Sequence, residues 1–349
     1  MTPRPQTEVP RPADRSESLT RVVRLVAREA GYDVDHDDLS AALGLSLFAC
    51  AVLDSPDVGD WSAHGRDAFL IEAARLFGMN IREIHPPEAA VGLRRSPEFR
   101  QHFDASYKPL IEHALAHQQP VLAWRGWVGP RDLTWSVIRR RDDSAIGFSA
   151  AAATPDAHAE GEECSFDYPP VQVYVVETVT PTSLGPLDLT PCALEHAYQS
   201  LSNEIGAGVG VVTGPAAYDA WAQHLTQEAG PSDDPQGRGD ASDIAIASVG
   251  RRAEDHAAHA ASIVRSHESG VRFFQRAHDA SSGDERMLPA TLVETCGHVV
   301  EAAAPLTDVG AMRKRLADAP GREEISRHIA EAKAATTKAL TALAARRRR

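Results

Sequence analysis

The sequence predicts an α+β protein: helices first, then an antiparallel sheet, then an all-helical region. The period of the apolar residues carries this prediction. They recur at helical spacing before residue 118 and again after residue 190, whereas between residues 120 and 179 they alternate with polar residues. Helices that precede an antiparallel sheet are typical of α+β domains, because parallel sheets require alternating strands and helices.

The first hundred residues are predicted to be mainly helical. Residues 18–30 place apolar side chains on one face of a helix. Residues 41–53 are apolar almost throughout and fit either a buried helix or a buried strand. A further helix ends at Gly78, a residue suited to the left-handed backbone of a C-cap. Residues 96–117 open with an N-cap serine and a proline, and form the next helical region.

Strands are predicted next. Residues 120–124 form a short apolar run, and residues 133–138 alternate with a period of two. A turn at residues 141–144 leads into a partner strand that begins near Ile146. Residues 171–179 are rich in β-branched side chains and form the strongest strand signal of the chain.

The remainder is predicted to be a helical bundle. Thr190 and Pro191 resemble the cap and first turn of a helix. The glycine-rich stretch 206–214 is interpreted as a loop, since it lies between two helices rather than after a strand. Further helices are expected over residues 217–225, 245–278, 287–303 and 322–344.

This order predicts four segments. They are a disordered leader (1–17), an α+β domain (18–182), a helical domain (188–345) and a basic tail (346–349).

Composition narrows the possible functions. The 349 residues carry a formal net charge of −13, which argues against a nucleic-acid surface because phosphate binding depends on lysine and arginine. No apolar run approaches the ~20 residues that cross a bilayer, and the leader lacks the apolar core of a signal peptide. The four cysteines form no CxxC pair, a pattern that favours reduced thiols and a cytoplasmic location.

Three stretches carry a resemblance to known proteins. They are AALGLSLFACAVL (41–53), IEHALAHQQPVLAW (111–124) and DLTWSVIRRRDDSAIGFS (132–149). Their order resembles the papain-like domain of bacteriocin-processing peptidases, and more closely the N-terminal domain of butirosin biosynthesis protein H and its relatives. TGPAAYDAWAQHL (213–225) is similar to the helical region that follows in those relatives. The resemblance implies a papain-like fold.

In that family a cysteine attacks an acyl group, a histidine deprotonates it, and an aspartate or asparagine orients the histidine. The aligned positions in this chain lack all three groups. Trp135 stands in place of the histidine, and an indole cannot accept a proton. Ser149 or Ala150 replaces the orienting residue. The cysteine would fall near Ser46 or Leu47.

The leading hypothesis is therefore a catalytically degenerate, papain-like protein that binds a small molecule, a peptide or a protein partner. Tryptophans gather around the position of a papain-like cleft, where an arginine could recognise an anionic group. The candidate binding residues are Trp61, Trp124, Arg125, Trp127 and Trp135.

Alternatives remain open. Cys50 follows the expected nucleophile position by about one helical turn. The rival hypothesis is therefore an acyltransferase or amide-processing enzyme that uses Cys50 as its nucleophile, and Ser46 is a weaker candidate that would need a histidine from elsewhere in the chain. The apolar neighbours of Cys50 in the sequence also fit a buried thiol with a purely structural role. His256 and His259 could share a helix face and bind a metal in the bundle. No cofactor is predicted, and the sequence does not decide the oligomeric state.

Overall fold

The computed structural model describes most of the chain. It covers residues 18–52, 66–84, 97–124, 135–140, 148–152, 162–164, 170, 172–204, 211–227 and 241–348.

The described elements confirm the α+β class, with helices and antiparallel strands followed by a helical region. The α-helices are Ser18–Glu29 (α2), His36–Ala42 (α3), Leu70–Leu76 (α4), Pro97–Ser106 (α6), Lys108–Ala116 (α7), Pro186–Leu201 (α8), Pro215–Gln227 (α9), Ala241–Ala280 (α10), Met287–Ala303 (α11), Val309–Leu316 (α12) and Ala319–Arg347 (α13). The strands are Cys50–Val52 (β1), Met79–Glu83 (β2), Val121–Trp124 (β3), Trp135–Arg140 (β4), Phe148–Ala152 (β5), Glu162–Cys164 (β6), Gln172–Val179 (β7) and Val211–Thr213 (β8). Short 3₁₀ turns occupy Arg66–Phe69 (η2), Gly283–Arg286 (η3) and Ala304–Leu306 (η4).

Six strands form one sheet in the order β2-β7-β3-β4-β5-β6, and every neighbouring pair in it is antiparallel. The predicted pairing of the two strands is confirmed, because β4 pairs antiparallel with β5, while the predicted turn at residues 141–144 lies outside the described residues. The edge strand β2 was not predicted. It lies directly after Gly78, whose positive φ of 70° ends the preceding helix as the sequence indicates.

The two faces of this sheet pack against different helices. Val121 and Ala123 of β3 belong to a core with the apolar side chains of α6 and α7. Leu122 and Trp124 of the same strand belong to a second core, which includes side chains of α2, α4 and α8. The alternation of side chains along a strand produces this division.

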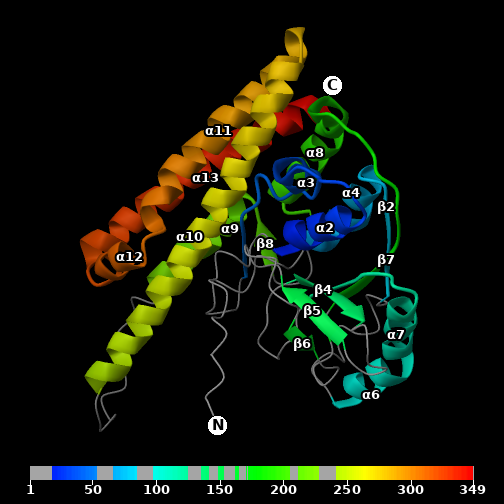
Figure 1. Ribbon diagram of the computed structural model, residues 1–349. Coiled ribbons are helices and arrows are strands. Elements are labelled where there is room, and N and C mark those ends of the chain that lie inside the picture. Colours follow the sequence, from blue (N-terminus) through cyan, green and yellow to red (C-terminus); the bar gives the residue numbers. More distant parts are fainter. Residues whose placement is uncertain are drawn as a thin grey trace.

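Three long helices, α10, α11 and α13, run side by side as the yellow, orange and red ribbons of Figure 1. With α9 and α12 they enclose a further core of mostly small and aliphatic side chains. The predicted helix over residues 287–303 coincides with α11. Among the described helices, none has the length and apolar character needed to cross a membrane.

The apolar run 41–53 is neither one helix nor one strand. Helix α3 ends at Ala42, and the chain then reaches β1, which pairs with β8. The strand β8 corrects the expectation of a loop over residues 206–214 and of an all-helical second half. A short strand forms there because β1, far away in the sequence, supplies its hydrogen-bonding partner.

Helix α8 also begins earlier than predicted. Pro186 occupies its first turn, and the Asp188 carboxylate accepts a hydrogen bond of 2.8 Å from the Gly185 backbone N–H. Thr190 and Pro191 therefore lie inside the helix rather than at its start. The GPxD arrangement supplies an alternative cap one turn upstream.

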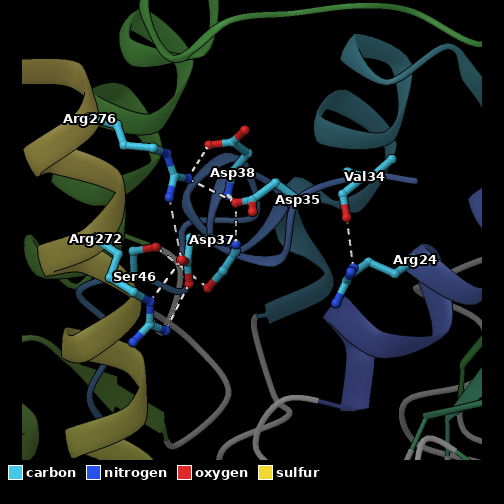
Figure 2. Close-up of polar contacts among 9 residues, drawn as sticks. Arg24, Val34, Asp35, Asp37, Asp38, Ser46, Arg272 and Arg276 are labelled. Atoms are coloured by element: carbon cyan, nitrogen blue, oxygen red, sulfur yellow. Dashed lines mark hydrogen bonds and ion pairs between the residues drawn. The ribbon is translucent and has the colours of Figure 1, made fainter. Parts of the chain in front are cut away.

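Charged side chains attach α3 to α10 (Figure 2). Arg272 donates two hydrogen bonds to Asp37, of 2.8 and 2.9 Å, and Arg276 donates to Asp35 and Asp38. Burial would raise the pKa of the Asp37 carboxyl, but its hydrogen bonds and the nearby positive charges, chiefly those of Arg272, together outweigh burial and hold the pKa below its ordinary value. We call these five residues the α3–α10 clamp. It fixes the position of α3, and hence of its last residue, Ala42.

Candidate functional site

Of the two predicted nucleophiles, Ser46 is buried, and the side chain of Cys50 lies outside the described residues. Ser46 is only 2% exposed, and its hydroxyl lies 3.5 Å from the Ser40 hydroxyl. The backbone of Cys50 belongs to β1 and pairs with Thr213, while its side chain lies outside the described residues. A nucleophile must be reached by its substrate, so the burial of Ser46 argues against that role.

Two of the predicted binding tryptophans belong to the core. Trp124 and Trp135 face each other across β3 and β4, and each is 1% exposed. The Trp135 ring lies 5.9 Å from that of Tyr174. Because both indoles are covered, neither lines an open cleft in this structure, which corrects the expectation for these two residues. Trp61, Arg125 and Trp127 lie outside the described residues.

The two histidines considered for a metal have other contacts. His256 is buried, and its Nδ1 accepts a hydrogen bond of 2.9 Å from the indole N–H of Trp221. The His259 ring packs edge-on against the same indole at 4.7 Å. The Trp221 hydrogen bond occupies one possible ligand atom of His256, so the pair acts as core structure here.

An apolar cavity of about 450 Å³ lies between α8, α11 and α13. Leu194 and Pro289 are buried among its walls, while Leu187 is 46% exposed and Met287 69% exposed. Among the described residues only three large apolar side chains are exposed, and two of them border this cavity. Its charged lining residues are Asp284, Glu285 and Arg346.

A second constellation joins α8 to α4. Cys192 and His196 are four residues apart on α8 and therefore share a face. The Cys192 sulfur lies 3.4 Å from His196 Nδ1, and His196 Nε2 lies 3.3 Å from a carboxylate oxygen of Glu72. Among the described residues, no other group of three or more metal-ligating side chains brings its ligand atoms this close together. We call Glu72, Cys192 and His196 the Cys–His–Glu cluster.

Electrostatics disfavour the free thiolate at this cluster. Burial, and next the negative charge of Glu72, raise the pKa of Cys192 to about 12. A thiol in such surroundings is a poor nucleophile on its own, because attack requires the thiolate. The cluster therefore does not replace the missing Cys–His pair of the papain-like pattern.

Sequence reasoning overlooked this cluster. The CxxxH spacing was visible, but placing the helix start at Thr190 put Cys192 in a first turn rather than in the helix interior. Nothing in the sequence around Glu72 indicates a role in this cluster, because only the tertiary structure brings Glu72 near Cys192 and His196.

Comparison of the chain with family models, with curated proteins and with solved structures found no match. The butirosin H-like, papain-like resemblance thus rests on the sequence stretches alone, and a function is inferred from the geometry of the described residues.

Proposed function

We propose that this protein binds an amphiphilic small molecule, with the apolar part of the ligand in the cavity between α8, α11 and α13. The observation that carries this proposal is an apolar cavity of about 450 Å³ bordered by the exposed side chains of Leu187 and Met287. Pockets of roughly 300–1,000 Å³ with mainly apolar walls and a few polar groups are typical of small-molecule sites.

The polar groups of the cavity define the ligand class. The hydroxyl of Thr190 donates to the Pro186 carbonyl and that of Thr291 to the Met287 carbonyl, so both donors are engaged within their own helices. The charged groups left at the cavity are Asp284, Glu285 and Arg346. An apolar body with one polar end, directed toward these side chains, fits this distribution.

The proposal keeps the ligand-binding, non-catalytic function that the sequence favours. It places the binding site in the α8–α11–α13 cavity instead of the predicted tryptophan-lined cleft. Trp124 and Trp135 are covered by the core, whereas the α8–α11–α13 cavity is accessible through its exposed rim.

Binding of Nile red, an uncharged dye that fluoresces in apolar surroundings, tests the proposal. Ala342 lines the cavity and Thr341, next to it, is exposed. We expect saturable binding of one dye per chain, with affinity lowered at least about tenfold by Ala342→Phe, or about 1.4 kcal/mol. Thr341→Phe adds a similar ring outside the cavity and should leave the affinity unchanged.

Circular dichroism and thermal unfolding check that both variants fold. Absence of saturable binding by the wild type, or equal affinities of the folded Ala342→Phe variant and the wild type, would contradict a ligand site in this cavity.

A further inference from the structure

The Cys–His–Glu cluster offers three different ligand atoms at one point. They are a sulfur, an imidazole nitrogen and a carboxylate oxygen, and all lie within 4.8 Å of one another. By helical spacing, Cys192 and His196 are on the side of α8 opposite Leu187 and Leu194, which line the apolar cavity. The cluster is therefore separate from the proposed ligand site.

The hydrogen bond of His196 to Ala42 implies that a proton or a metal cation lies between the imidazole and the Glu72 carboxylate. His196 Nδ1 lies 2.5 Å from the backbone carbonyl oxygen of Ala42, so this nitrogen carries a hydrogen and donates it. A neutral imidazole has only one N–H, which leaves the Nε2 lone pair facing the Glu72 carboxylate at 3.3 Å. Two acceptors at this distance repel unless a proton or a metal cation lies between them.

The separation between His196 Nε2 and the Glu72 oxygen fits a tetrahedral metal ion, and the Cys192 sulfur lies near enough to reach the same ion by rotation of its side chain. With ordinary bond lengths, a tetrahedral zinc ion holds nitrogen and oxygen ligands about 3.4 Å apart and nitrogen and sulfur ligands about 3.6 Å apart. In the structure Nε2 lies 3.3 Å from the Glu72 oxygen and 3.8 Å from the Cys192 sulfur. The sulfur also lies 3.4 Å from Nδ1, beside the ring rather than beyond Nε2, so the Cys192 side chain has to rotate and carry its sulfur toward Nε2 when the ion binds.

The neighbours of His196 fix the orientation of its imidazole in the way that is typical of metal-ligating histidines in other proteins. A ligating histidine commonly donates its other N–H to a backbone carbonyl, which fixes the tautomer. Ala42, at the end of α3, provides this carbonyl, and the α3–α10 clamp holds α3 in place. The Phe69 ring stacks on the imidazole at 4.0 Å with an interplanar angle of 14°, which restricts rotation of the ring.

We propose that Cys192, His196 Nε2 and Glu72 bind one Zn²⁺ ion. A mixed sulfur, nitrogen and oxygen set suits this borderline-soft cation. The Glu72 side chain is 69% exposed, so the fourth coordination position faces solvent and takes a water molecule. On binding, the Cys192 S–H proton leaves to solvent, so that one proton per chain is released.

The test is titration of chelator-treated, reduced protein with Co²⁺, which occupies zinc sites and shows a thiolate-to-cobalt charge-transfer band. We expect one ion per chain and this band in the wild type, with Zn²⁺ displacing the Co²⁺. Cys192→Ser should abolish the band and lower the Zn²⁺ affinity at least about tenfold. Cys50→Ser is the matched thiol control and should leave both unchanged.

Glu72→Gln provides a second variant, since Glu72 is exposed and the change is isosteric. It should retain the charge-transfer band but bind Zn²⁺ at least about tenfold more weakly. Absence of a stoichiometric band in the wild type would overturn the proposal in favour of a protonated His196 paired with Glu72. A band that persists in Cys192→Ser, or an unchanged affinity in Glu72→Gln, would overturn the ligand set.

Discussion

At the scale of single residues, His267 on α10 makes stability depend on pH. It is almost fully buried, its Nδ1 donates to the Ile263 carbonyl at 2.8 Å, and its Nε2 has no hydrogen-bond partner. Burial lowers its pKa from 6.5 to about 4. The unfolded chain therefore binds a proton between these pH values that the folded protein does not.

The free energy of unfolding is thus highest above pH 6.5, falls as the pH drops from 6.5 to about 4, and levels off below that. The shift corresponds to a loss of about 3 kcal/mol. Urea unfolding at several pH values should show that His267→Met loses less free energy of unfolding over this range than the wild type. Parallel pH profiles for the two proteins would rule out this role for His267.

Two helical glycines form a matched pair with opposite expectations. A Cβ added at Gly270 on α10 would lie 2.3 Å from the Ser46 carbonyl oxygen, whereas one added at Gly297 on α11 would meet no atom within 4 Å. Gly270→Ala should destabilise the protein by about 1–3 kcal/mol because the backbone of residue 46 has to move. Gly297→Ala should stabilise it by about 0.5–1 kcal/mol through helix propensity. The urea midpoint of each variant, compared with that of the wild type, shows whether the variant is destabilised or stabilised. Equal shifts of the two midpoints would contradict the close packing of α10 on residue 46.

At the scale of elements, the α3–α10 clamp determines where α3 lies. Asp37 is mostly buried, and Arg272 provides its two shortest ion-pair contacts. Removal of the guanidinium leaves a mostly buried carboxylate whose remaining arginine contact, with Arg276, is longer, at 3.6 Å. Arg272→Ala should therefore lower the free energy of unfolding by about 1–3 kcal/mol.

Arg327→Ala is the control for this change. Arg327 and Glu331 form an exposed pair on α13 at 3.9 Å, and such pairs contribute about 0.3–0.5 kcal/mol. Chemical denaturation of the two variants compares them directly. If both variants were destabilised equally, the clamp would contribute no more than a surface ion pair.

At the scale of the whole molecule, one core joins the two halves of the chain. It contains Leu122, Trp124 and Val176 from the sheet, together with Phe273 from α10 and Leu343 from α13. A fragment that ends at residue 182 would expose this shared surface to water. We expect residues 1–182 alone to lack a cooperative thermal transition, which circular dichroism measures against the full chain. A cooperative transition in the fragment would show that the first half folds independently.

The sequence by itself determined the local elements. The helical period over residues 287–303 predicts α11, the alternation over residues 133–138 predicts β4, and Gly78 marks the end of a helix. These features depend on neighbouring residues, whose spacing decides which side chains share a face. The α+β order and the antiparallel hairpin followed from the same signal.

Only the tertiary structure decided which distant residues meet. It paired β8 with β1, covered Trp124 and Trp135 on the inner face of the sheet, and brought Glu72 next to Cys192 and His196. Periodicity reveals that a face is apolar but not which element covers it, because that choice depends on how several elements fill one core together. The candidate cavity and the proposed metal site both lie where such elements meet, which is why local pattern alone could not locate them.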